Sequence, residues 1–446
     1  MAKREHDQLT GQEPARSSSE KGPAVPIQTA SVGPTVVVSR RAAEKLLAGH
    51  VWVYRTDIEA LRPAAGSGGI PAGALVAVAD SRGMFLGTAL FSDASMIALR
   101  MISTDNLADR AAFLHLLRDR VARALQMRQH LLAGAPSTSA CRLVFSEADE
   151  LPGIVIDRYG ELLILQLLTQ GTYCDDVRST IVETLLLELG TGGTTAIVER
   201  PDPRIRELEQ LSAPFSAPLY AKDADQPKLA TVFQLNGLRF HFDANAGQKT
   251  GAFLDQRENY AAAAQHGHGR ALDVCTYQGG FALHLARRCP KVTGVDVSRA
   301  ALEVAERNLD ENRGQFVENG RGVEWIEASA FELLRDWSDA GEEFDTIVLD
   351  PPAFAKSKRA AEGALRGYKE MNLRALKMLR PGGVLVTCSC SHHVPLADFQ
   401  AVVAAAASDA KRRVRLLEIR GAALDHPAVL TIPETQYLKC LICQVE

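Results

Sequence analysis

The order of apolar and polar positions divides the chain into a polar N-terminal stretch and three segments of different texture. Residues 1–33 are rich in Ser, Glu, Gln and Pro. Such a stretch cannot bury enough apolar surface to offset the loss of chain entropy, so it predicts a disordered tail.

Residues 34–105 contain short apolar runs separated by clusters of Gly, Asp and Ser. One short helix is expected over 41–48, and strands are expected over 36–38, 51–54, 74–79, 83–89 and 97–102. Several short strands with turn signals between them predict a small β-barrel domain.

Residues 106–243 predict a central α/β domain. A long helix is expected over 105–131 and a second over 175–189, with strands over 154–157, 162–168, 196–199 and 238–243. Residues 34–130 carry 12 Lys and Arg against 8 Asp and Glu. This positive balance fits a surface that faces phosphates, but a solvated helix face explains it equally well, because five of the arginines fall in one helical stretch.

In residues 244–446 the pattern changes to apolar strands that alternate with long helices. Strands are expected over 271–274, 292–297, 323–326, 346–349 and 384–388, and helices over 281–288, 299–312, 331–337 and 363–378. This order predicts a Rossmann-like, mostly parallel sheet with helices on both faces. No helix is expected between the last strands, 413–419 and 436–444, so they should pair as a hairpin and give the sheet one antiparallel strand.

Composition and charge narrow the class of protein. Of the 446 residues, 46% are hydrophobic and 23% charged, which is ordinary for a globular protein. The net charge of -4 argues against a uniformly basic surface. The N-terminus lacks the apolar core of a signal peptide, no run is long enough to cross a bilayer, and the eight cysteines have no regular spacing. We therefore expect reduced thiols and a cytoplasmic location.

A cofactor signal follows the first strand of the third segment, in the stretch LDVCTYQGG that contains Asp273 and Tyr277. Gly279 and Gly280 would let a ligand approach the backbone, and Asp296, at the end of the second strand, could accept hydrogen bonds from a ribose. The full G-x-G-x-x-G of dinucleotide sites is absent. The pattern favours S-adenosylmethionine, although a tight turn and a helix cap would use the same residues.

The chemical signal lies at the ends of two later strands, in VLDPPAFAKSK and TCSCSHHV. Two prolines should fix Asp350 and Phe354 at the sheet edge, where a flipped base needs a polar partner and an aromatic face. Cys390 should lie on the same rim. An exposed cysteine with a lowered pKa could add to carbon 6 of a pyrimidine and make carbon 5 nucleophilic. The plainer alternatives are that Phe354 fills the core and that Cys390 is a small buried hydrophobe.

Two other roles for cysteines are possible. Cys388 competes with Cys390 as the nucleophile, but it is expected to pack within the sheet. Cys440 and Cys443 could join Cys388, Cys390 and the two following histidines as zinc ligands, but they should point to opposite faces of one strand. We expect no metal site.

These stretches resemble the RlmI family of class I methyltransferases, which methylate carbon 5 of a cytosine in large-subunit ribosomal RNA. The resemblance covers about residues 34–446 and rests on SEADELPGIVIDRYG, GQKTGAFLDQREN, the turn at 277–281, LDPPAFAKSK, RGYKEMN, the SCS at 389–391, and the DHP and YLK near the end. It implies a PUA RNA-binding domain over 34–105, a central domain over 106–243 and a methyltransferase domain over 244–446.

The resemblance also implies residue roles. Cys390 would be the nucleophile and Asp350 the Asp of the DPP motif. The cofactor site would be lined by Lys249, Thr250, Gly251, Asp255, Gln256 and Arg257. The family usually has an Asp at the end of the third strand, where it reaches the adenine amino group. Here Ser329 stands in that place, and it can accept a hydrogen bond but carries no charge.

Three functions remain at this point. The first is a cytosine-5 methyltransferase acting on 23S ribosomal RNA. The second is an exocyclic-amine RNA methyltransferase, which would use the DPPAF loop without a cysteine. The third is a non-catalytic ribosome-assembly factor, which Ser329 would favour and the intact Asp296, Asp350 and Cys390 oppose. Ribosomal RNA is the expected partner, no membrane is expected, and a homodimer is one assembly that the sequence leaves open.

Overall fold

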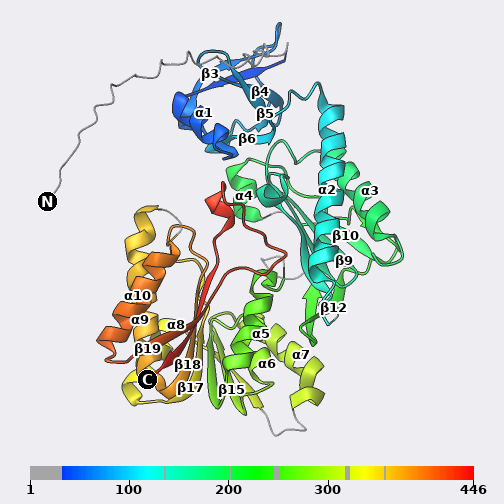
Figure 1. Ribbon diagram of the computed structural model, residues 1–446. Helices are drawn as coiled ribbons and strands as arrows, with labels where there is room; N and C mark the ends of the chain where they lie inside the picture. Colours follow the sequence, from blue (N-terminus) through cyan, green and yellow to red (C-terminus); the bar gives the residue numbers. More distant parts are fainter. Residues whose placement is uncertain (1–32, 135–136, 201, 246–250, 317–321, 356–357) are drawn as a thin grey trace, which may run out of the picture.

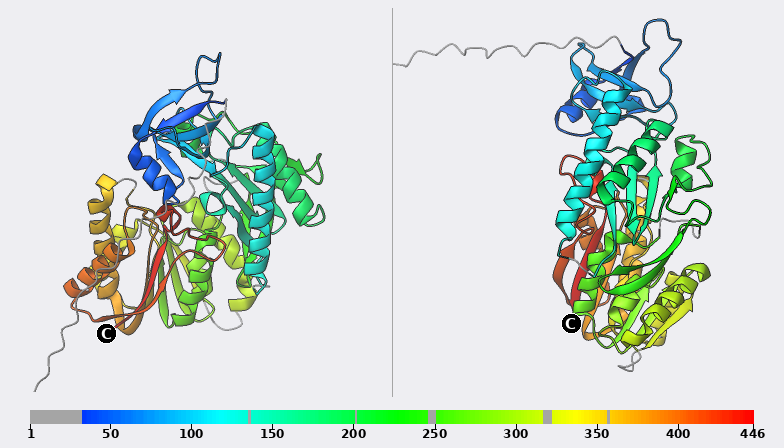
Figure 2. Two further views of the ribbon diagram at one scale, coloured as in Figure 1. Left: turned by 45° about the horizontal axis from the view of Figure 1, so that its top comes forward. Right: turned by 90° about the vertical axis from the view of Figure 1, so that its right-hand side faces the viewer.

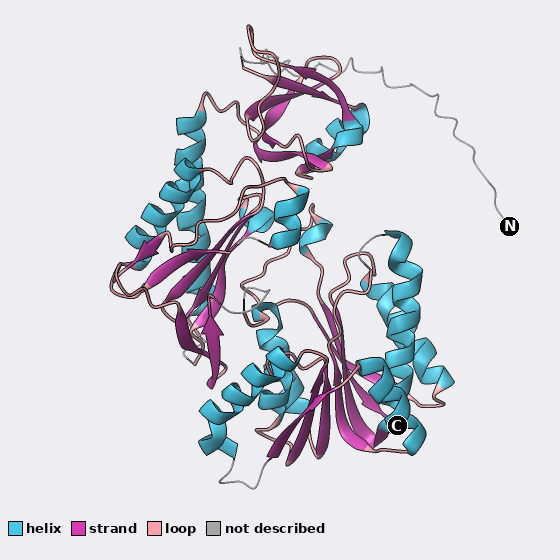
Figure 3. Ribbon diagram, turned by 180° about the vertical axis from the view of Figure 1, so that it is seen from behind, coloured by secondary structure: helices cyan, strands magenta, loops and turns pink. Residues whose placement is uncertain are grey.

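The computed structural model describes residues 33–134, 137–200, 202–245, 251–316, 322–355 and 358–446. These residues form three domains that follow one another along the molecule, each built on its own sheet (Figures 1 and 3). The tail expected over residues 1–33 lies almost entirely outside the described residues.

The N-terminal domain is a six-stranded sheet of order β2-β6-β5-β4-β1-β3. Its elements are β1 (Thr35–Val38), α1 (Arg40–Leu47), β2 (Trp52–Tyr54), β3 (Ile58–Arg62), β4 (Leu75–Asp80), β5 (Phe85–Phe91) and β6 (Ile97–Ser103). Ser39 caps α1, since its hydroxyl accepts from the backbone N–H of Ala42. Five of these strands and the helix match the predictions. Strand β3 was not predicted, and its position at the sheet edge leaves it largely exposed, with a weak apolar signal.

The central domain has a five-stranded sheet of order β11-β10-β9-β8-β7, covered by two long helices (Figure 1). Its elements are α2 (Arg110–Leu132), β7 (Ala140–Phe145), β8 (Ile154–Tyr159), β9 (Leu162–Leu167), α3 (Asp175–Leu189), β10 (Ala196–Glu199), α4 (Pro203–Leu208) and β11 (Tyr220–Ala221). Apolar residues of α2 and α3 form one core with the sheet. The predicted helices and strands are present, and β7, β11 and α4 are additional.

A hairpin of β12 (Ala230–Leu235) and β13 (Leu238–Asp243) links the central and third domains. The backbone N–H of Arg239 donates to Asn312 Oδ1 at 2.9 Å, and that of His241 donates to Asn308 Oδ1 at 2.7 Å. Both asparagines lie on a helix of the third domain. The boundary expected at residue 243 therefore falls at the end of a hairpin that is bonded to the third domain; Figure 2 shows it between the two sheets.

The third domain is a seven-stranded sheet of order β16-β15-β14-β17-β18-β20-β19. Its strands are β14 (Arg270–Val274), β15 (Lys291–Asp296), β16 (Gly322–Glu327), β17 (Phe344–Leu349), β18 (Leu379–Ser389), β19 (Val414–Arg420) and β20 (Lys439–Val445). Only β20 among them runs antiparallel to its neighbours, as predicted. Strands β19 and β20 do pair, but a long segment, residues 421–438, connects them.

Helices cover both faces of this sheet. They are α5 (Arg257–His266), α6 (Gly280–Leu285) and α7 (Arg299–Phe316) on one face, and α8 (Ala330–Ala340), α9 (Ala361–Met378) and α10 (Leu396–Asp409) on the other. Helix α10 was not predicted. The Rossmann-like sheet predicted from the alternation of strands and helices is thus confirmed, and the strand ends that should carry the site lie together on its upper edge (Figure 1).

Within the described ranges, no helix combines the length and the apolar character that a membrane crossing requires. All eight cysteines are free thiols.

Candidate active site

The turn after β14 has a strained backbone. Cys275 and Tyr277 adopt positive φ angles of 65° and 52°, and Gly279 follows with 84°. The N–H of Tyr277 donates to Asp296 Oδ2 at 2.9 Å, which ties the turn to the end of β15. Non-glycine residues in this region cost free energy and concentrate at functional sites, so the turn is a ligand-binding candidate.

The two glycines of this turn are needed for packing inside the protein. A Cβ on Gly280 would lie 2.5 Å from the Tyr260 ring, and one on Gly279 would lie 2.8 Å from the Trp325 ring. Protein side chains therefore fill the space in the Cβ direction, which gives both glycines a packing reason; their role in letting a ligand approach the backbone stays a prediction.

Asp273 supports the turn from within the sheet. Its Oδ2 accepts from the Thr276 hydroxyl at 2.5 Å and from the Ala282 N–H at 2.9 Å. Burial raises its pKa to about 7, against the effect of these two hydrogen bonds. Its Oδ1 is buried and has no hydrogen-bond partner among the described residues.

Asp296 and Ser329 lie at the ends of neighbouring strands, because β15 pairs with β16 up to Asp296 and Glu327. Asp296 Oδ1 accepts from the N–H of Ser298 at 2.9 Å, so each carboxylate oxygen still has a free lone pair. Ser329 begins α8, and its side chain does not cap the helix. Val297 is 74% exposed and Phe331 40% exposed. The Asp296 carboxylate suits the ribose hydroxyls of an adenosine, and the Ser329 hydroxyl and the exposed apolar side chains suit its adenine.

Gln256 connects the stretch before α5 to the DPP motif. Its Nε2 donates to Asp350 Oδ1 at 3.0 Å, and its Oε1 accepts from Asn259 Nδ2 at 2.6 Å. Asn259 is held in turn by Arg420, whose Nε donates to Asn259 Oδ1 at 3.0 Å. Gln256 thus orients the Asp350 carboxylate. A small cavity beside it is lined by Ala252, Phe253, Cys275, Thr276, Tyr277, Gln278, Gly280 and Asp350.

The other residues expected in this stretch have different positions. Lys249 and Thr250 lie outside the described residues. Gly251 has a φ of 114°, and a Cβ there would lie 2.6 Å from the Phe242 ring. The Arg257 guanidinium is buried and donates to Asp425 Oδ2 at 2.9 Å. The Arg257 guanidinium therefore serves a domain junction, and its role as a cofactor contact stays a prediction.

Cys390 directly follows β18, on the rim that carries Asp350. Its Sγ lies 4.0 Å from the Pro351 carbonyl oxygen. Burial, followed by the carboxylates of Asp350 and Asp255, raises the pKa of the thiol, and Lys439 lowers it, so that the pKa is about 11. The lowered pKa expected of a reactive cysteine is therefore absent in this state, and the environment favours the neutral thiol.

The serines on either side of Cys390 fix the rim. Ser389 Oγ donates to Tyr368 Oη at 3.0 Å, and Tyr368 Oη lies 2.8 Å from Ser391 Oγ. Ser391 Oγ also accepts from the N–H of Ala355 at 3.2 Å. Tyr368 belongs to the RGYKEMN motif and Ala355 to the DPPAFA loop, so the three motifs meet around the cysteine.

Phe354 is half-buried and packs against other aromatic rings. Its centroid lies 4.8 Å from that of Tyr368 and 5.8 Å from that of Phe331. This packing matches the core-filling alternative. Its use as a stacking surface for a base stays a prediction.

Cys388 is fully buried and pairs with Cys440 across β18 and β20. The expectation that it packs within the sheet is confirmed. In the described part of the chain, no three metal-ligating side chains converge.

Two residues of the YLK motif enter the site without having been singled out. Tyr437 Oη donates to Asp255 Oδ2 at 2.5 Å. Lys439 Nζ donates to the carbonyl oxygens of Ser391 at 2.7 Å and Tyr437 at 2.8 Å. The YLK motif in the sequence could have pointed to these two residues. Their contacts with the site could not be predicted from it, because they depend on β20 lying beside β18.

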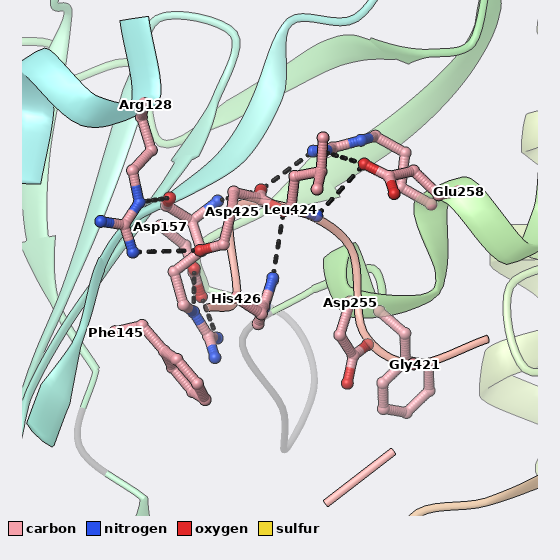
Figure 4. Close-up of polar contacts among 12 residues, drawn as sticks. Arg128, Phe145, Asp157, Asp255, Glu258, Gly421, Leu424, Asp425 and His426 are labelled. Atoms are coloured by element: carbon pink, nitrogen blue, oxygen red, sulfur yellow. Dashed lines mark hydrogen bonds and ion pairs between the residues drawn. The ribbon is translucent and has the colours of Figure 1, made fainter. Parts of the chain in front are cut away.

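Asp425, of the DHP motif, joins the third domain to the central one (Figure 4). Besides Arg257, its Oδ2 accepts from the N–H of Arg142 at 2.8 Å, and its carbonyl oxygen accepts from Arg128 at 3.1 Å. Burial opposes ionisation of Asp425, but His426 and Arg257 outweigh it and lower its pKa. Arg128 also pairs with Asp149 of the SEADELPG motif.

Two solved structures share this architecture. A putative S-adenosylmethionine-dependent methyltransferase from Streptococcus mutans is 18% identical with a TM-score of 0.75, and the match covers 92% of this chain and 99% of that one. A putative methyltransferase complexed with SAH is 18% identical with a TM-score of 0.74 and the same coverage. At this identity the likeness establishes the fold alone.

Family models match two parts of the chain. Residues 36–104 match the PUA-like domain, and residues 223–422 match the S-adenosylmethionine-dependent methyltransferase. S-adenosylmethionine is therefore the cofactor, as predicted, and the acceptors at Asp296 and Ser329 suit an adenosine.

Curated relatives match almost end to end, and each is named ribosomal RNA large subunit methyltransferase I. The protein from Photobacterium profundum is 36% identical over 400 residues, which are 89% of this chain and 96% of the relative. Those from Shewanella denitrificans and Klebsiella pneumoniae are 38% and 34% identical and are covered over 95% and 100% of their length, with 89% and 94% of this chain aligned. With this identity over nearly the whole of each relative, the chain belongs to the ribosomal RNA large subunit methyltransferase I family.

Proposed function

We propose that the protein methylates carbon 5 of a cytosine in 23S ribosomal RNA, in the cytoplasm, through a covalent adduct with Cys390. The observation that carries this proposal is the position of Cys390 at the end of β18, on the same rim as Asp350 and 4.0 Å from the backbone of the DPP loop. The substrate class follows the name of the relatives, ribosomal RNA large subunit methyltransferase I.

The cofactor would lie between the turn after β14 and the ends of β15 and β16. Asp296 would bind the ribose hydroxyls, and Ser329, Val297 and Phe331 would surround the adenine. Tyr277 and Phe253, whose ring centroids lie 5.0 Å apart, would close the other side. S-adenosylmethionine supplies an electrophilic methyl group at this place.

The residues on the rim would act on the base. The Cys390 thiolate forms a bond to carbon 6, and the electron pair of the 5,6 double bond becomes available at carbon 5 for the methyl group. Asp350, oriented by Gln256, would share a proton with ring nitrogen 3 and stabilise the adduct. Loss of the carbon 5 proton then restores the double bond and releases Cys390.

The N-terminal domain would add RNA affinity without taking part in the chemistry. It is attached firmly, because Glu147 of the central domain accepts from Trp52 Nε1 at 2.8 Å and from Arg100 at 3.2 Å. Phosphate contacts from this domain would make RNA affinity fall with rising salt.

A second reaction, methylation of an exocyclic amine, is favoured by one observation. Burial raises the pKa of Cys390 to about 11, and amine methylation needs no thiolate. In that reaction Asp350 and the DPP loop would hold the amine, and Cys390 would have no chemical role.

The deciding experiment is methylation of ribosomal RNA by the Cys390→Ala variant, with the product identified by mass spectrometry. The proposal expects 5-methylcytosine from the wild type, no product from Cys390→Ala, and little change from Cys388→Ala. Product at the wild-type rate from Cys390→Ala would overturn the covalent mechanism in favour of amine methylation.

A further inference from the structure

Lys439 places a buried amino group beside the candidate nucleophile. It is the first residue of β20, and its partner in the antiparallel pairing with β18 is Ser389, the residue before Cys390. The residue is only 7% exposed. A lysine is seldom buried unless it has a charged partner or a function.

The hydrogen bonds of Lys439 hold it against the turn that carries Cys390. Its Nζ donates to the carbonyl oxygen of Ser391, the residue after Cys390, at 2.7 Å, and to that of Tyr437 at 2.8 Å. An ammonium group has three N–H donors. The amino group is therefore hydrogen-bonded to the backbone on one side of Cys390. The ammonium form retains a third N–H donor, and the neutral amine has a lone pair instead.

The charge of Lys439 has no carboxylate partner among the described residues. The two carboxylates near Cys390 are engaged elsewhere: Asp255 accepts from Tyr437 and Asp350 accepts from Gln256. Burial lowers the pKa of Lys439 to about 8, against the effect of a charge on Cys390. Amine and ammonium forms are therefore both populated near neutral pH.

We propose that Lys439 is the proton partner of Cys390. The S–H bond of Cys390 breaks, its proton passes through a bridging water to form an N–H bond on the neutral amine of Lys439, and the electron pair stays on sulfur as a thiolate near an ammonium. When Cys390 later leaves carbon 6, the same proton can return to sulfur. This inference rests on the proposed covalent function and names the group that makes its first step feasible.

Lys439 offsets the charges that oppose the thiolate. Five ionisable groups interact electrostatically with Cys390 or Lys439, and each comes from a different part of the domain. They are Asp255 before α5, Asp350 after β17, Tyr368 on α9, His392 after β18 and Tyr437 before β20. The carboxylates of Asp350 and Asp255 disfavour a negative charge on Cys390. The pKa of His392 is lowered by partial desolvation, against the effect of Glu434 and with that of His393 and Lys439, so His392 cannot replace a buried ammonium.

The test measures the thiolate directly, without RNA or methyl transfer. Full-length protein is treated with iodoacetamide between pH 6 and 10, and the rate at Cys390 is read by peptide mass spectrometry. The variants are Lys439→Gln and Lys439→Arg. Lys369→Gln is the matched control, because it removes a lysine that pairs with Asp409 on the outer helices. S-adenosylmethionine binding verifies that each variant folds.

Lys439→Gln should slow alkylation of Cys390 at pH 8 by about tenfold or more, the effect of losing one nearby opposite charge. Lys369→Gln should match the wild type. Lys439→Arg keeps its cation above pH 8, so at pH 10 its Cys390 should react faster than the wild-type cysteine. If Lys439→Gln does not fold, the Arg variant decides alone.

The inference would be overturned if the alkylation rate of Cys390 had the same pH dependence in Lys439→Gln and Lys439→Arg as in the wild type. Lys439 would then be only a structural link between β18 and β20. The failure of the covalent mechanism would look different. In that case alkylation would still depend on Lys439, while Cys390→Ala would continue to methylate RNA.

Discussion

Asp425 should be the residue whose loss loosens the catalytic domain from the central domain. Its carboxylate is fully buried. It accepts from the Arg257 guanidinium at 2.9 Å, from the Arg142 N–H at 2.8 Å and from His426 Nδ1 at 3.2 Å. Among the described residues, Asp425→Ala would leave the buried Arg257 guanidinium with the 3.3 Å contact to Glu258 alone.

Breaking a buried ion pair by removing one partner costs about 3–5 kcal/mol. The orphaned N–H of Arg142 would add about 1–3 kcal/mol if the effects were independent, but groups in one network do not add. We therefore expect Asp425→Ala to lower the free energy of unfolding by about 3–5 kcal/mol, the range for the ion pair alone.

Urea denaturation followed by tryptophan fluorescence is a suitable assay, because Trp52 reports on the N-terminal domain and Trp325 and Trp337 on the catalytic domain. The catalytic-domain transition should move to lower urea. Asp336→Ala is the matched control: this residue of α8 is exposed, and its side chain has no hydrogen bond or ion pair with another described residue, so its loss should change stability by less than about 0.5 kcal/mol.

The pH dependence gives a second signature. The pKa of Asp425 is lowered in the folded protein, so its contribution is complete above the ordinary carboxyl range and is lost as the pH falls below about 4. The wild type should lose this stability in acid, and Asp425→Ala should show a shallower decline. A difference under about 1 kcal/mol between the two proteins at pH 7 would refute the reasoning, because a buried charge cannot lose its partner at so small a cost.

Three further predictions concern the site. Asp296→Ala should raise the Kd for S-adenosylmethionine roughly 10- to 150-fold, the value of about 1.5–3 kcal/mol for hydrogen bonds to a charged group; calorimetry showing an unchanged Kd would remove Asp296 from the cofactor site. Gly280→Ala should abolish cofactor binding, since its Cβ would lie 2.5 Å from the Tyr260 ring; normal binding by this variant would contradict the packing. Tyr368→Phe should lower stability by about 1–3 kcal/mol and slow methylation, because two serine hydroxyls lose their shared partner; a wild-type rate would show that the rim does not need this bond.

The architecture of the catalytic domain could be predicted because its strands and helices alternate strongly. The antiparallel β20 followed from the missing helix between the last two strands. The segments that were missed have weaker patterns. Strand β3 lies at an edge with a largely exposed burial pattern. The alanine-rich helix α10 gives little contrast between its faces.

The positions of site residues could be predicted where they depend on a single motif. Contacts between residues of different motifs could not. Asp350 and Cys390 lie on the expected rim because both follow parallel strands. The buried ion pair of Arg257 could not be predicted because its partner, Asp425, is 168 residues away in the chain. The burial that raises the pKa of Cys390 and the approach of Lys439 likewise depend on strand order, which no local pattern contains.

The most direct test of the central claim is a covalent trap. RNA carrying 5-fluorocytosine at the target position should form a stable crosslink with the wild-type protein in the presence of S-adenosylmethionine, because fluorine cannot leave carbon 5 as a proton does. The crosslinked peptide should contain Cys390, and Cys390→Ala should form none. Efficient methylation of unmodified RNA with no crosslink to the fluorinated RNA would contradict a covalent cysteine mechanism.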